Sequence, residues 1–281
     1  MKIFQVITTK LKRRYKRWER RLMLSKRQQF VLLTAILTAG LMLTQLVSDE
    51  LRYPLVLCLS LASYLLTAFG LREDLRGAEW LTLLLLPTLF TTAIALFYFL
   101  LPVRWLTRLP VAALYAIGIY ALLLTENIYN VAANRTIGLL RAAHSVGFLL
   151  TLVTYFFLIQ TILAFRFSPG VNLGLVSLTS ALLFLPSLWT MELTTVVSRR
   201  VWQLTAILSL VQGELAWIFS FWPVTTTIKA LFFISTFYSL AGLTQLYLME
   251  KLYKRNVWEL FSVTLIVLFL VLFTTHWRGN F

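Results

Sequence analysis

The stretch WLTLLLLPTLFTTAIALFYFLL (residues 80–101) contains no charged residue and is long enough to cross a membrane as one helix. The hydrocarbon core of a bilayer is about 30 Å thick, which takes about 20 apolar residues at the rise of an α-helix. Similar apolar runs recur along the chain, separated by short polar connections. Strands of a β-barrel would be shorter and would alternate polar and apolar residues. The pattern therefore predicts an all-α, polytopic transmembrane helix bundle.

Nine spans are predicted in this way, and together they form a transmembrane helical domain over residues 28–281. Ser25 and Gln28 have the spacing of a capping box, which indicates that a helix begins there. Pro87 and Pro186 fall inside spans and should kink them unless neighbouring groups compensate. Besides 80–101, the spans are expected at about 28–47, 53–70, 110–131, 141–165, 171–190, 202–222, 224–249 and 257–276.

Composition excludes several classes of protein. The 281 residues are 59% hydrophobic and 13% charged, whereas soluble domains are about 45–50% apolar and about 25% charged. A single cysteine rules out an internal disulfide bond. The nucleotide-binding pattern G-x-x-x-x-G-K-[ST], the zinc-protease pattern H-E-x-x-H and the hydrolase pattern G-x-S-x-G are all missing. We therefore expect no enzymatic activity, no cofactor and no metal site.

Residues 1–27 form a basic arm that holds eleven of the 26 Lys and Arg residues. Its apolar residues recur at helical spacing, as in Leu11, Tyr15, Trp18 and Leu22. A basic amphipathic helix of this kind lies on an anionic membrane surface. A disordered cationic tail, or an arm that binds RNA or protein, is the alternative. The residues expected to contact lipid headgroups are Lys10, Lys12, Arg13, Arg14, Lys16, Arg17, Trp18, Arg20 and Arg21.

Charge distribution predicts the topology. With the N-terminus in the cytoplasm, the nine spans place 20 Lys and Arg residues on the cytoplasmic side and five on the outer side, in agreement with the positive-inside rule. Tryptophans are expected at both interfaces, with Trp80, Trp189, Trp202 and Trp258 on the inner side. The expected location is a bacterial inner membrane, with the C-terminus outside.

A first polar cluster is predicted where the fourth span meets the fifth. Glu126, Asn127 and Asn130 lie in the fourth span, with Glu126 and Asn130 four residues apart on one helix face. Arg141 and His144 lie three apart at the start of the fifth span. One interpretation is a structural Glu126–Arg141 ion pair that joins the helices. The other is a site for a proton or a substrate, with His144 titrating near neutrality.

A second polar pair, Glu214 in the seventh span and Lys229 in the eighth, flanks the turn at Pro223. At 1.5 Å per residue the two heights along the helices differ by about 4–5 Å. A buried ion pair is therefore predicted between them. A lysine that reaches outward to the interface and a carboxylate that serves transport are the alternatives.

Three segments carry a family resemblance: TENIYNVAANRTIGLLRAAHSVGFLLTL (125–152), LPSLWTMEL followed by SRR (185–200), and VWELFSVTLIVLFLVLFTTHW (257–277). They resemble an uncharacterised family of bacterial multipass membrane proteins. The resemblance implies a helical membrane protein, but it carries over no activity and no functional residue.

Function is expected to be non-enzymatic, because no loop is large enough for a soluble catalytic domain. The leading prediction is a membrane scaffold or interaction component whose arm binds the anionic cytoplasmic leaflet, and whose other partners are membrane proteins. We do not expect a nucleic-acid partner. The alternative is a transporter of a small solute or lipid that uses intramembrane carboxylates. A cavity lined by Glu126, Asn130 or Glu214 would favour transport, and a closed bundle would favour a scaffold.

Overall fold

The computed structural model describes residues 25–44, 51–72, 75, 77–101, 105–132 and 138–275. Within this part of the chain there are nine helices, all long and apolar enough to cross a membrane, and no strands. The predicted all-α membrane fold is therefore confirmed. The helices are α2 (Lys26–Thr44), α3 (Arg52–Leu71), α4 (Glu79–Tyr98), α5 (Trp105–Ala132), α6 (Leu140–Ala164), α7 (Pro169–Glu192), α8 (Arg199–Ser220), α9 (Thr226–Leu248) and α10 (Lys254–Thr274).

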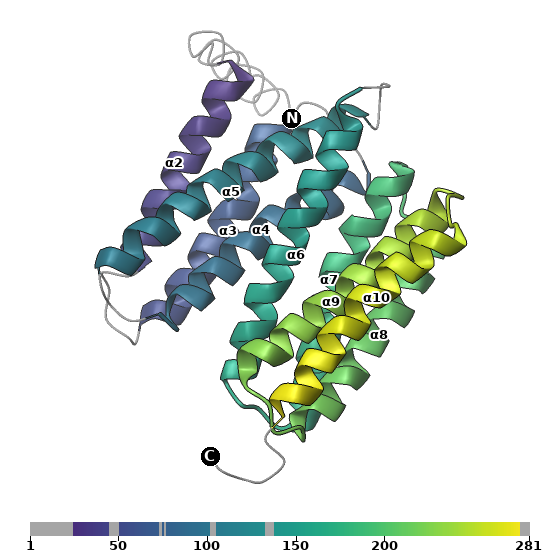
Figure 1. Ribbon diagram of the computed structural model, residues 1–281. Helices are drawn as coiled ribbons and strands as arrows, with labels where there is room; N and C mark the ends of the chain where they lie inside the picture. The colour runs from purple at the N-terminus through teal and green to yellow at the C-terminus, as the bar shows by residue number, and fades with distance from the viewer. Residues whose placement is uncertain are drawn as a thin grey trace, which may run out of the picture.

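Successive helices run in opposite directions through one bundle. The even-numbered helices begin at its upper end in Figure 1, and the odd-numbered helices begin at its lower end. Helix α6 lies between the group α2–α5 and the group α7–α10, and it packs against α4, α5, α7 and α9. The start of α2 and the end of α10 therefore lie at opposite ends of the bundle (Figure 1).

Helix boundaries follow the sequence closely, with one exception. The capping box at the start of α2 is confirmed, because Ser25 N donates to Gln28 Oε1 (2.9 Å) and Gln28 N donates to Ser25 Oγ (3.4 Å). Helix α5 begins at Trp105 rather than at 110, so Pro110 lies inside a helix instead of at its end. Hydropathy alone does not reveal a turn that extends the helix beyond the apolar run.

Hydroxyl and aromatic side chains join the helices inside the bundle. Lipid provides no hydrophobic driving force between helices, so close packing and interhelical hydrogen bonds hold a membrane bundle together. Phe237 of α9 stacks on Phe184 of α7, with ring centroids 4.1 Å apart. The interhelical hydrogen bonds include Ser63–Thr91 (3.0 Å), Thr91–Tyr115 (2.9 Å), Tyr155–Ser180 (3.0 Å), Gln212–Thr236 (3.1 Å) and Ser239–Thr264 (2.7 Å).

Trp189 differs in exposure from the other tryptophans predicted at the inner interface. Trp80, Trp202 and Trp258 are partly exposed, as expected of residues at an interface. Trp189 is fully buried, and its Nε1 donates to the carbonyl of Thr194 (2.9 Å). Position along the chain sets the depth of a residue in the membrane, but the rotation of the helix decides whether the side chain faces lipid or protein.

The basic arm lies outside the described residues apart from Ser25, Lys26 and Arg27. The predicted headgroup contacts of Lys10, Lys12, Arg13, Arg14, Lys16, Arg17, Trp18, Arg20 and Arg21 therefore remain predictions.

Candidate functional site

A small polar cavity lies in the upper half of the bundle, where α6 meets the helices on either side. Its volume is about 20 Å³. This is room for one water molecule, since a cavity needs about 10–15 Å³ to hold one. We call it the carboxylate cavity. It is lined by Leu86 of α4, Glu126 and Tyr129 of α5, His144, Gly147, Phe148 and Thr151 of α6, Pro186, Ser187, Thr190 and Met191 of α7, and Gln245 of α9.

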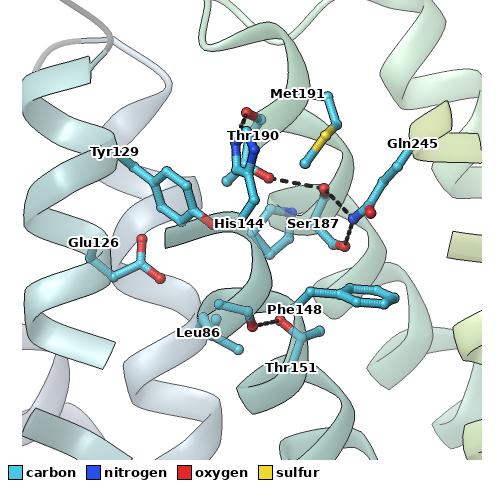
Figure 2. Close-up of a pocket in the computed structure, with 12 residues that line it drawn as sticks. Leu86, Glu126, Tyr129, His144, Phe148, Thr151, Ser187, Thr190, Met191 and Gln245 are labelled. Atoms are coloured by element: carbon cyan, nitrogen blue, oxygen red, sulfur yellow. Dashed lines mark hydrogen bonds between the residues drawn. The ribbon is translucent and has the colours of Figure 1, made fainter. Parts of the chain in front are cut away.

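Glu126 is the acidic residue of this cavity. Its side chain is 2% exposed, and no hydrogen bond or ion pair joins its carboxyl to any described residue. Figure 2 shows the carboxyl pointing from α5 toward the cavity with no dashed line attached. An unpartnered carboxylate is costly inside a membrane, where ionisable groups pair with one another or face water. The cavity is therefore the place where a proton, a water molecule or a cation can satisfy Glu126.

His144 and Tyr129 separate Glu126 from the α7 wall. The Nε2 of His144 lies 3.1 Å from the carbonyl oxygen of Thr190. A carbonyl only accepts, so this nitrogen carries a proton and Nδ1 is left as the free ring atom. The hydroxyl of Tyr129 donates to the carbonyl of Ala143 (2.9 Å), and its ring lies 5.5 Å from that of His144. These contacts fix both rings beside the cavity.

The far wall is built from α7 and α9. The Nε2 of Gln245 donates to both the carbonyl oxygen (3.1 Å) and the Oγ (2.9 Å) of Ser187 (Figure 2). Thr190 Oγ1 donates to the same carbonyl of Ser187 (3.0 Å). Sequence reasoning missed all three residues. The available signal was a proline, Pro186, inside a span and followed by hydroxyl residues, because proline leaves backbone groups that polar side chains can bond.

A groove adjoins the carboxylate cavity. It has a volume of about 480 Å³ and shares His144, Phe148, Met191 and Gln245 with the cavity. We call it the α6–α10 groove, because α6 and α10 contribute opposite walls and α9 lies between them. Its volume is within the range of about 300–1,000 Å³ that is usual for small-ligand sites.

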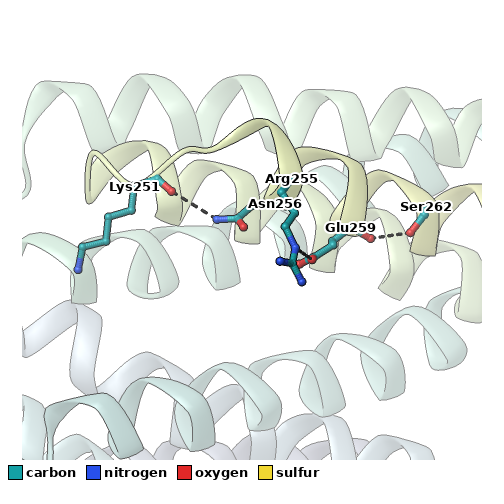
Figure 3. A network of polar contacts seen from close by, with 5 residues as sticks. All are labelled: Lys251, Arg255, Asn256, Glu259 and Ser262. Carbon is teal, nitrogen blue, oxygen red and sulfur yellow. Dashed lines mark hydrogen bonds and ion pairs between the residues drawn. The ribbon is translucent and has the colours of Figure 1, made fainter.

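Polar groups of α10 lie at the upper part of this groove. Asn256 and Glu259 line it, and the Nε of Arg255 donates to Glu259 Oε1 at 2.8 Å. Figure 3 shows these side chains extending from the first turns of α10, with Asn256 Nδ2 reaching back to the carbonyl of Lys251 (3.4 Å). The groove therefore has a charged entrance near one end of the bundle and His144 at its inner wall.

The predicted Glu126–Arg141 pair is wrong. Arg141 is exposed in the first turn of α6, and it forms no ion pair with a described residue. A long cationic side chain near a helix end reaches the interface at low cost, whereas pairing would draw it into the core. Asn130 is buried, and its Nδ2 donates to the carbonyl of Leu71 at the end of α3 (3.1 Å). Asn127 is half-buried and does not line the cavity.

The predicted Glu214–Lys229 pair is also wrong. Glu214 is exposed on α8, while the Nζ of Lys229 donates to the carbonyl of Phe219 (2.7 Å). The side of α8 that faces α9 is marked by Gln212, which is fully buried and bonded to Thr236. At about 100° per residue, Glu214 points roughly 200° away from Gln212. The predicted heights of Glu214 and Lys229 along their helices were compatible with a pair, but the two side chains face different directions.

Metal ligands do not gather in the part of the chain that the structure describes: no group of three or more His, Cys, Asp or Glu residues there could hold an ion. The expectation that the protein needs no cofactor remains a prediction.

Comparisons with known proteins place part of the chain in context. Residues 135–274 match the model of a family described as "Protein of unknown function (DUF5656)". The matched region runs through α6–α10 and includes His144, Ser187, Thr190 and Gln245, but not Glu126. No curated protein and no solved structure matches the chain. The chain is therefore a multi-pass membrane protein with nine candidate spans, whose second half is similar to a family of unknown function, DUF5656.

Proposed function

We propose that this protein is a non-enzymatic, proton-coupled transporter of a small solute, with Glu126 as the carboxyl that binds the proton. The observation that carries the proposal is that Glu126 is buried beside a polar cavity and has no partner among the described residues. Ionisable residues of this kind inside membranes mark ion and proton pathways. The α6–α10 groove supplies the space for the solute, and His144 lies between this groove and the cavity.

Infrared difference spectroscopy tests proton binding. Spectra of the full-length protein in lipid, recorded between acid and alkaline pH, should contain a carboxyl carbonyl band that is lost in Glu126→Gln. The matched control is Glu214→Gln, which removes an exposed carboxyl from the same bundle and should retain that band. A spectrum of Glu126→Gln equal to that of the wild type would show that Glu126 does not take up a proton.

Transport is tested in vesicles that contain the full-length protein and a trapped pH-sensitive dye. With an imposed pH gradient and a mixture of small solutes on one side of the membrane, wild-type vesicles should lose the gradient faster than protein-free vesicles. Glu126→Gln should return the rate to that of protein-free vesicles, and Glu214→Gln should not. Equal rates for the wild type and protein-free vesicles would contradict transport, even if Glu126 binds a proton.

A second candidate is the interaction component predicted from the sequence. Helix α10 favours it, because Val271 is its one fully buried side chain and much of the surface that faces away from α9 is exposed and apolar. Proton binding at Glu126 without proton flux would make this the better proposal.

Orientation is also a proposal. We infer a cytoplasmic N-terminus, an external C-terminus and a bacterial inner membrane, with the arm on the anionic cytoplasmic leaflet. Reporter fusions before Met1 and at Lys254 should read cytoplasmic, and fusions at Arg108 and Phe281 should read external. A cytoplasmic signal at Phe281 would contradict the inferred topology. The described basic residues favour the upper end of the bundle as the cytoplasmic end, because more of them lie there than at the lower end. At the upper end lie Arg72, Arg141, Arg199, Arg200, Lys251, Lys254 and Arg255, and at the lower end lie Arg52, Arg108 and Arg166.

A further inference from the structure

A second and larger pocket lies at the lower end of the bundle, opposite the end that carries the entrance to the α6–α10 groove. It has a volume of about 680 Å³ and lies between the α6–α7 and α8–α9 connections. We call it the basic pocket. Its polar lining consists of Arg166, Asn172, Ser220, Thr225, Thr226 and Lys229, and it contains no carboxylate from the described residues.

Two cationic side chains face this pocket. The Nζ of Lys229 donates one hydrogen bond to the carbonyl of Phe219 (2.7 Å), which holds the ammonium in place and leaves two of its three N–H donors for a ligand. Arg166 is exposed at the end of α6, with a left-handed backbone (φ 51°). Two cations without an acidic residue among the lining side chains favour an anionic ligand.

Two helix N-termini add to this field. Helices α7 and α9 both begin at the basic pocket, and neither N-cap residue, Ser168 or Thr225, makes a side-chain capping bond. At the other end of the bundle, the N-cap Ser198 of α8 does accept a bond from Val201 N (3.2 Å). The first N–H groups of a helix have no partner within the helix and carry partial positive charge. Uncapped N-termini beside a pocket are therefore suited to bind an anion.

The hydrogen bonds of Asn172 indicate that the ligand carries a hydroxyl group. It is 5% exposed, and its Nδ2 donates to the carbonyl of Phe167 (3.2 Å) and to Ser220 Oγ (3.1 Å). Its Oδ1 is buried and has no donor among the described residues. A ligand O–H that reached Oδ1 would supply the missing donor.

We propose that the basic pocket binds a phosphate group that carries or adjoins a hydroxyl. The cations and helix N-termini contact the phosphate oxygens, and Asn172 accepts from the hydroxyl. Two sources have this chemistry: free hydrogen phosphate and a phosphatidylglycerol headgroup. The pocket lies where the apolar helices end, which is the depth of lipid headgroups.

The test uses the full-length protein and separates the two sources. Thermal unfolding in detergent is followed against inorganic phosphate, with chloride at equal ionic strength as the reference. Native mass spectrometry of the same protein compares retention of phosphatidylglycerol with that of phosphatidylcholine. A phosphate-specific rise in melting temperature indicates the free anion, and selective retention of phosphatidylglycerol indicates the lipid; either result supports the pocket.

Variants test whether phosphate or phosphatidylglycerol binds at the basic pocket. Arg166→Asn keeps a residue that tolerates a left-handed backbone and should weaken binding about tenfold, as expected for losing one charge-assisted hydrogen bond. Lys229→Met should weaken it further. The matched controls, Arg199→Gln and Lys251→Met, remove the same charges at the opposite end and should leave binding unchanged. Equal losses in the controls would show non-specific attraction and would overturn the proposal, as would binding of neither phosphate nor phosphatidylglycerol above its reference.

Discussion

Replacing Gly213 with valine is expected to lower the free energy of unfolding by about 3 kcal/mol, the upper part of the usual range for overpacked cores. Gly213 lies on α8 against α7, and these two helices share the most extensive contact in the bundle. A Cβ atom at this position would overlap Ser177 Oγ and would lie 3.0 Å from the carbonyl oxygen of Leu173. Backbone at that distance cannot move aside cheaply, so α7 and α8 would have to separate.

Thermal unfolding in detergent measures this effect. Gly174→Val is the matched control, because a Cβ at Gly174 meets nothing within 4 Å. Gly213→Ala should also lower the melting temperature, because its methyl group would overlap the Ser177 hydroxyl. Adding Ser177→Ala to that variant should recover part of the lost stability, since it removes the overlapping hydroxyl but leaves the Leu173 carbonyl in place. Similar melting temperatures for Gly213→Val and Gly174→Val would contradict the close approach of α7 and α8.

Trp189→Ala is expected to cost about 3–5 kcal/mol, the range for truncating a large buried aromatic side chain. The ring is fully buried near the end of α7, and its N–H satisfies the carbonyl of Thr194. The next carbonyl, that of Thr195, accepts from Ala78 N (2.9 Å) at the start of α4. Loss of the indole would therefore leave a hole and loosen the α7–α8 connection against α4.

Trp202→Ala is the comparison for this variant. Trp202 is a tryptophan near the same end of the bundle, but it is 50% exposed, so its truncation should change the melting temperature little. Trp189→Phe should lie between the two, because it keeps one aromatic ring but loses the rest of the indole and its hydrogen bond, the latter worth about 1 kcal/mol. An equal effect of the two alanine variants would contradict the burial of Trp189 inside the bundle.

The positions of the nine spans could be predicted because a helix crosses a membrane if a single stretch of sequence is long and apolar enough. Length and apolarity decide it, and both can be read along the chain. The capping box at Ser25 and Gln28 is equally local, and it has the predicted bonds. In contrast, the Glu214–Lys229 pair needed the rotation of each helix as well as the height of each residue. The hydropathy of α8 gives its length but does not show that Gln212 faces α9.

The candidate site was predicted in part. Glu126 and His144 lie near the facing ends of two consecutive spans, so their positions in the sequence predicted that they lie close together, and both line the same cavity. Ser187, Thr190 and Gln245 come from α7 and α9, and only the packing of α6 between the two groups of helices brings them there. A pairing such as Glu126–Arg141 was attractive on charge alone, but Arg141 gains more from the exposed interface.

Helix α10 forms a wall of the groove and contributes little to the core. Val271 is its one buried side chain within Lys254–Thr274, and its main neighbour is α9. Two bonds of Ser239, to the Leu260 carbonyl and to Thr264 Oγ1 (both 2.7 Å), hold the middle of α10 against α9. Trp222 Nε1 donates to Thr275 Oγ1 (2.9 Å) at the end of the same helix. The width of the groove therefore depends on a few polar bonds along α10, whereas Glu126 lies among side chains that several helices bury together.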